Sequence, residues 1–135
     1  MVKNLNIDIS NSCTSVQIFG INTSLKDYQL CSLINNFFEI EIHLLDVSHF
    51  NKEFSAFGNT VDETKIVLIQ NSHSIFPKLE PFEYIVLIGD DDEDLAEMVK
   101  TFESNDEILY ISKIDNTHLS SKDLGLTSQL LALLQ

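Results

Sequence analysis

Apolar residues recur along this chain in two patterns that predict a β-sheet. Strict alternation marks residues 5–9 and 39–47; in the second stretch, Ile40, Ile42 and Leu44 alternate with polar neighbours and predict one buried face. Continuous apolar runs, rich in β-branched residues, are typical of strands covered on both faces. Such runs fall at residues 84–88 and 108–111 and, nearly continuous, at 65–70, and a further strand is expected at residues 16–21.

Helical spacing follows two of these strands. Leu95, Met98, Val99 and Phe102 occur at i, i+3, i+4 and i+7, which places them on one face of a helix. An earlier helix is expected from about residue 25 to residue 38, with Ser24 and Asp27 in the spacing of a capping box. The acidic run at residues 90–94 suits the start of the second helix. Carboxylates there accept hydrogen bonds from free backbone N–H groups, and their negative charge interacts favourably with the positive end of the helix dipole.

The order strand, helix, two to three strands, strand, helix, strand predicts an α+β fold. We expect a two-layer sandwich in which two main helices lie on one face of a largely antiparallel sheet, as in ferredoxin-like or ACT-like folds. A doubly wound parallel sheet is the alternative, although it would need more helices. The length of 135 residues predicts one domain, 1–135, and the leucine-rich end is interpreted as docked core or as a partner-binding helix face.

The net charge of the chain limits the kinds of partner that it is expected to bind. With 21 acidic and 8 basic residues the net charge is −13, and this field repels nucleic-acid backbones and anionic membrane surfaces. We expect a protein partner or a second copy of the chain, and neither nucleic acid nor membrane. A cytoplasmic location is expected, since no signal sequence or spanning segment is recognisable and two cysteines do not indicate a disulfide framework.

The acidic turn supplies the metal candidates, Asp90, Asp92 and Asp94. Counted from Asp90, the sixth and twelfth positions of a calcium loop would be Gly and Glu, but Leu95 and Thr101 stand there. Helix capping therefore remains the favoured interpretation. No nucleotide loop, zinc motif or nucleophile motif occurs, so no cofactor is expected and a noncatalytic role is favoured.

A shared polar surface is a second hypothesis for the same turn. If the two helices begin side by side, residues at the start of the first helix would join the acidic turn; they are Lys26, Asp27 and Tyr28 on one side and Asp91 and Glu93 on the other. Two independently capped helices are the alternative.

Residues 76–84, FPKLEPFEY, resemble the motif that names the IPExxxVDY family of small bacterial proteins. Pro77 and Tyr84 are identical to the motif, while Phe76, Phe82 and Glu83 take the places of Ile, Val and Asp. The resemblance extends to residues 25–35, to the strand and acidic turn after Tyr84, and to residues 113–126. It implies a small cytoplasmic protein without an established biochemical activity, and with Lys78 in place of Glu, it implies no catalytic role for the motif.

Three functions follow in order of preference. The first is a noncatalytic protein-interaction or regulatory module, and the second is an ACT-like domain that binds a small molecule in a pocket. The third is a metal-assisted enzyme that would act through Asp90, Asp92 or Glu93.

Overall fold

The computed structural model describes residues 16–48, 50, 54–71, 75–76, 79, 81–89, 93–115, 117 and 119–134, without the side chains of residues 93–96. The strands are β1 (Gln17–Thr23), β2 (His43–Leu44), β3 (Ala56–Val61), β4 (Thr64–Gln70), β5 (Tyr84–Ile88) and β6 (Ile108–Ile114). The helices are α2 (Asp27–Phe38), α3 (Glu93–Phe102) and α4 (Ser121–Leu131), with a final 3-10 turn at Ala132–Leu134. The strand expected at residues 5–9 lies outside the described residues.

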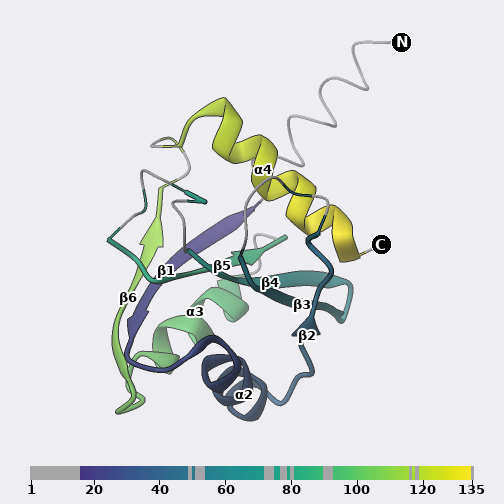
Figure 1. Cartoon of the computed structure of the whole chain (residues 1–135). Helices are drawn as coiled ribbons and strands as arrows, with labels where there is room; N and C mark the ends of the chain where they lie inside the picture. The colour runs from purple at the N-terminus through teal and green to yellow at the C-terminus, as the bar shows by residue number, and fades with distance from the viewer. Residues whose placement is uncertain are drawn as a thin grey trace.

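The six strands form one sheet in the order β2-β3-β4-β5-β1-β6, and every neighbouring pair is antiparallel. Figure 1 shows α2 and α3 below this sheet and α4 above it. The expected α+β class and antiparallel sheet are confirmed, and the doubly wound parallel alternative is wrong.

Two apolar cores cover the two faces of the sheet. Phe19, Leu68 and Val86 belong to the core under α2 and α3, whereas alternate residues such as Ile18 and Leu87 belong to the core under α4. This alternation explains why β4 and β5 read as continuous apolar runs, since side chains on both faces are buried. The expectation of two layers is therefore incomplete, because α4 adds a third.

The third layer is built by the C-terminal leucines. Ser120 and Asp123 form a capping box, in which the Asp123 N–H donates to Ser120 Oγ at 3.1 Å and the Ser120 N–H donates to Asp123 Oδ2 at 3.4 Å. Leu130 and Leu131 of the resulting helix are buried against the sheet. Of the two interpretations of the leucine-rich end, docked core is the one the structure adopts.

The first helix starts later than the expected capping box. Its N-cap is Lys26, whose N–H donates to Gln29 Oε1 at 2.9 Å, and Asp27 is already helical. Ser24 lies two residues before that N-cap, so the capping box expected from Ser24 and Asp27 does not form.

Two local corrections concern the edges of the sheet. The stretch 39–47 gives only the two-residue strand β2, and Leu44 is 67% exposed instead of buried. In β6 a register shift opposite Asn22 and Thr23 places Ile108 and Ile111 in the same core, although simple alternation assigned them to opposite faces.

Candidate functional site

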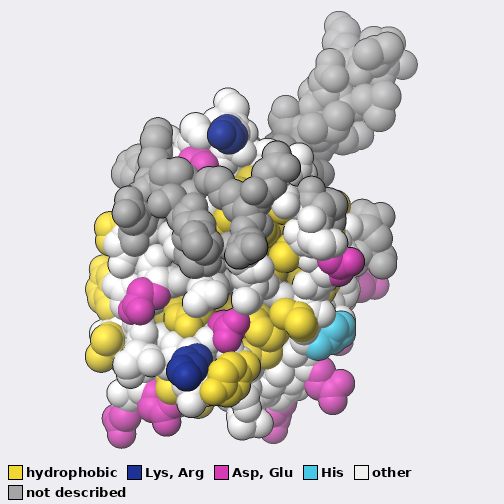
Figure 2. Space-filling model, viewed as in Figure 1, with side chains coloured by type: hydrophobic (Ala, Val, Ile, Leu, Met, Phe, Trp, Pro, Cys, Tyr) yellow, Lys and Arg dark blue, Asp and Glu magenta, His cyan; other side chains and the backbone are white. Residues whose placement is uncertain are grey.

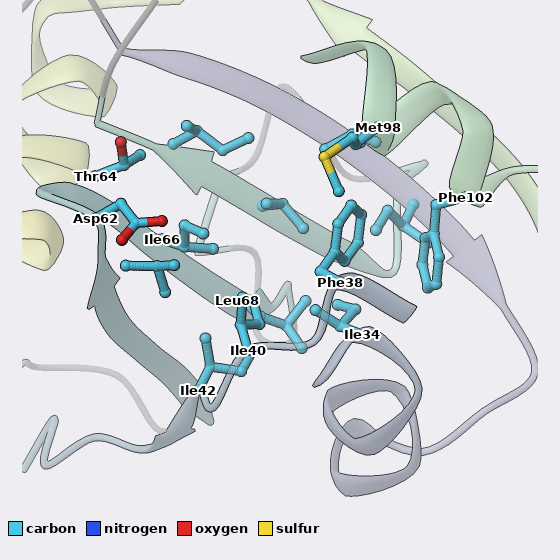
Figure 3. Close-up of a pocket in the computed structure, with 15 residues that line it drawn as sticks. Ile34, Phe38, Ile40, Ile42, Asp62, Thr64, Ile66, Leu68, Met98 and Phe102 are labelled. Atoms are coloured by element: carbon cyan, nitrogen blue, oxygen red, sulfur yellow. The ribbon is translucent and has the colours of Figure 1, made fainter. Parts of the chain in front are cut away.

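An apolar cavity of about 240 Å³ lies between the sheet and the helices α2 and α3. Its floor comes from β1, β4 and β5, and its walls come from both helices, the loop after α2 and the β3–β4 turn. Figure 3 shows Asp62 and Thr64 at one end of the cavity and Met98 and Phe102 at the other. The lining residues are Ile21, Ile34, Phe38, Ile40, Ile42, Val61, Asp62, Thr64, Ile66, Leu68, Val86, Ile88, Met98, Val99 and Phe102.

The wall after α2 is held in place chiefly by the side chain of Asn35, and Asn59 Nδ2 also donates to the Glu41 carbonyl at 2.7 Å. Helix α2 ends at Glu39, whose left-handed backbone (φ 56°) turns the chain back towards the sheet. Asn35 Nδ2 donates to the Ile42 carbonyl at 3.0 Å, and the Ile42 N–H donates to Asn35 Oδ1 at 2.8 Å. This amide clamp replaces the strand hydrogen bonds expected at residues 40–42, and both Ile40 and Ile42 line the cavity.

Cys31 lies beside this clamp. Its Sγ is 3.6 Å from the Ile42 carbonyl oxygen, and the thiol is buried. Burial, and to a lesser degree the charge of Asp27, raise the pKa of the Cys31 thiol, while its contact with Asn35 opposes that rise. The thiol is therefore held in its neutral form and packs as a small buried apolar residue.

The tight β3–β4 turn and α3 line opposite ends of the cavity. Asp62 and Glu63 both have left-handed backbones (φ 49° and 69°), the conformation that lets a two-residue loop join twisted antiparallel strands. Asp62 is exposed and lines the cavity, and Met98 of α3 is 42% exposed. Among the described lining residues Asp62 carries the only charged side chain, and Thr64 the only hydroxyl group.

The described residues of the segment that resembles the IPExxxVDY motif make structural contacts, and none of them lines the cavity. Phe76 is fully buried in the core under α4, and the phenol of Tyr84 donates to the Leu25 carbonyl at 2.8 Å. Phe82 stacks on Tyr110 with the ring centroids 6.2 Å apart. The Glu83 carboxylate accepts from the Thr23 N–H at 3.3 Å. Pro77 lies outside the described residues. These contacts tie the start of β5 to the end of β1 and to the start of α2.

Asn71 organises the loop that contains this motif. Its Oδ1 accepts from the Phe76 N–H at 2.9 Å, and its Nδ2 donates to the carbonyls of Leu79 and Phe82 at 3.0 and 3.2 Å. The Asn71 amide thus provides hydrogen bonds to loop backbone groups that have no partner in a neighbouring strand.

The acidic metal candidates fall largely outside the described residues. Asp90 and Asp92 are not described, and only the backbone of Asp94 is, within α3. Elsewhere in the described part of the chain, no group of three His, Cys, Asp or Glu side chains could hold a metal ion. The metal site at this turn stays a prediction.

The shared polar surface is not assembled by the described residues. In the antiparallel pair of β1 and β5, Gln17 lies opposite Ile88 and Ile21 lies opposite Tyr84. Helix α2 follows the end of β1 and α3 follows the end of β5, so Lys26, Asp27 and Tyr28 lie at the opposite end of these strands from Glu93. Asp91 is not described. Tyr28 is exposed, and Figure 2 shows acidic side chains distributed over the visible face.

The edge strand β6 carries the exposed apolar pair Leu109 and Tyr110, which are 71% and 50% exposed. An exposed edge can accept a further strand, but the Ile111 N–H already donates to Glu103 Oε2 at 2.9 Å. Together with the bulge, this side-chain hydrogen bond partly closes the edge to a pairing strand.

Comparison with protein-family models, curated proteins and solved structures gives no match for this chain. Membership of the IPExxxVDY family therefore stays a prediction. None of the helices in the described ranges is long and apolar enough to cross a membrane.

Sequence reasoning missed the cavity as a site. Its walls come from residues that look like ordinary core, and only Asp62 and Thr64, between two apolar strands, interrupt that pattern. Their position at a tight turn was a weak signal, because turn residues are usually polar for conformational reasons alone.

Proposed function

We propose that this protein is a noncatalytic module that binds a small, mainly apolar molecule in the cavity between α2, α3 and the sheet. The observation that carries the proposal is the apolar cavity of about 240 Å³, which has an exposed methionine at one end and an exposed carboxylate at the other. Ligand sites are typically concave and apolar with a few polar groups at defined positions, which is the composition of this lining.

The cavity volume limits the size of the ligand. A dry apolar cavity of about 150 Å³ accepts benzene, so a volume of about 240 Å³ corresponds to a ligand of roughly eight to ten non-hydrogen atoms. An eight-carbon chain or a substituted phenyl ring meets this limit. The polar lining residues, Asp62 and Thr64, form neither a nucleophile–base pair nor a pair of carboxylates, and this favours binding over catalysis.

We further propose that the module has a ferredoxin-like core. Strands β1, β4, β5 and β6 would be its four strands, in the spatial order β6-β1-β5-β4, with α2 and α3 as the two connecting helices. Strands β2 and β3 would then be an insertion between α2 and β4. The insertion supplies Val61 and Asp62 at one side of the cavity.

The binding proposal can be tested by titrating isotopically labelled protein with 1-octanol and following the amide signals by NMR. We expect saturable shifts, and we expect Met98→Trp to weaken binding because the larger ring would take up part of the space that Met98 lines. Leu109→Trp is the matched control, since it adds the same ring on an exposed edge far along the sheet from β4. Linear, non-saturating shifts, or equal binding by both variants, would contradict the proposal.

A protein contact through β6 is the second candidate, favoured by the neighbouring exposed side chains of Leu109 and Tyr110. If the partner is a second copy, sedimentation should show a concentration-dependent dimer that Leu109→Lys weakens. A monomer at every concentration would exclude self-association by this strand.

A further inference from the structure

We infer that the cavity selects ligands with a cationic head group, an alkyl- or arylalkyl-ammonium, over carboxylates of the same length. This inference rests on the proposed function, because it specifies which small molecule the cavity would take. It follows from the charge of Asp62 at one end of the cavity and from the absence of a compensating basic group among the described lining residues.

The first support is the position of Asp62. The tight turn leaves its side chain exposed while placing it among the residues that line the cavity, and Figure 3 shows the carboxylate turned towards Ile66. A ligand whose chain lies against Ile66 and Leu68 would bring its head group to this carboxylate. An ammonium group there gains a charge-assisted hydrogen bond, whereas a carboxylate would meet a like charge.

The second support is the direction in which Lys65, three residues after Asp62, projects from the sheet. Lys65 alternates along β4 with Ile66, and Ile66 belongs to the core under α2 and α3. A Cβ atom on Gly89 would meet both the Cβ of Lys65 and the Leu131 side chain of α4, so Lys65 projects from the face of the sheet that α4 covers. It cannot neutralise Asp62 within the cavity.

The net charge of the chain also favours a cationic ligand over an anionic one. A charge of −13 attracts cations and repels anions over the whole surface, which raises the local concentration of an ammonium ligand and lowers that of a carboxylate. The apolar lining adds a second requirement, which is an apolar body on the ligand. A metal ion or a small hydrophilic cation has no such body and therefore gains nothing from the lining.

The test compares three eight-carbon ligands, n-octylamine, 1-octanol and octanoate, by the same NMR titration at pH 7 and low salt. At that pH the amine is protonated, as a lysine side chain is. We expect octylamine to bind about tenfold more tightly than octanoate, and we expect this ratio to shrink in high salt.

Asp62→Asn should abolish most of that ratio while leaving the affinity for 1-octanol within about twofold, because the substitution removes charge but retains shape. Glu63→Gln is the matched control: it removes one charge from the same turn at a residue that does not line the cavity, and it should keep the ratio. Equal binding of amine and octanoate, or a ratio unchanged by Asp62→Asn, would overturn the inference while leaving the proposed function intact. Failure of all three ligands to bind would overturn both.

Discussion

The ring of Phe82 lies directly against the α-carbon of Gly20, where a Cβ atom would overlap with the ring carbons. Phe82 comes just before β5, and Gly20 lies in the middle of the neighbouring strand β1. Gly20 therefore leaves the space that the Phe82 ring occupies, and this ring stacks on Tyr110 of β6. This contact holds the loop that precedes β5 against the sheet.

Gly20→Ala should therefore destabilise the protein by about 1–3 kcal/mol, because the ring would have to leave its position. The same substitution should cost much less in a Phe82→Ala background, where the clash is gone. Urea unfolding of the two single variants and the double variant measures this coupling. Equal costs of Gly20→Ala in the two backgrounds would show that the ring does not need the glycine.

Asn71→Ala should be among the most damaging polar substitutions in the chain. It removes the acceptor for the Phe76 N–H and the donor for two carbonyl oxygens, and we expect a loss of about 2–4 kcal/mol. Asn36→Ala, at an exposed helical position, is the control and should change stability by less than about 0.5 kcal/mol. Similar unfolding midpoints for both variants would contradict the role given to Asn71.

Tyr84 should make stability depend on pH in the alkaline range. Burial is the main cause that raises the pKa of the Tyr84 phenol, followed by the charges of Asp27 and Glu83. The unfolded chain then loses this proton first, so the contribution is complete below about pH 10 and is lost as pH rises through the higher folded pKa.

Tyr84→Phe should lower stability at pH 7 by about 1 kcal/mol, because the hydrogen bond to the Leu25 carbonyl is lost. The difference from the unmodified protein should narrow above about pH 10, where that protein loses the phenol contribution. Urea unfolding between neutral and alkaline pH measures both effects. A difference that stays constant with pH would argue against the raised pKa.

Leu130→Ala tests whether α4 forms a real third layer. Leu130 is fully buried, so truncation should cost about 2–5 kcal/mol. Leu109→Ala is the control, since Leu109 is 71% exposed and should change stability by less than about 0.5 kcal/mol. Comparable, small effects of both substitutions would mean that α4 is not docked on the sheet.

The central elements of this fold could be predicted because their sequence patterns are local. The runs that became β4 and β5 read as strands buried on both faces, and the spacing of Val99 and Phe102 identified the buried face of α3. The prediction that two main helices share one face of the sheet is confirmed for α2 and α3, but the docking of α4 on the other face could not be predicted, because it depends on contacts between distant segments. For that reason the third layer formed by α4 was missed.

The errors at the sheet edges have specific physical causes. Alternation predicted a full strand through Leu44, but the amide of Asn35 captures the backbone at Ile42 and shortens the strand to two residues. In β6 a bulge changes which side chains face the core. The cavity could not be predicted either, because its walls carry the same apolar residues as a filled core.

The most direct test of the binding proposal uses the isoleucine methyl groups, which report on both faces of the sheet at once. Ile34, Ile42 and Ile66 line the cavity, whereas Ile18 and Ile85 belong to the core under α4. On titration with 1-octanol, the proposal predicts saturable methyl shifts and ligand contacts (intermolecular NOEs) for the first group and unchanged signals for the second. Shifts that are absent, or that are spread equally over both faces, would contradict binding in this cavity.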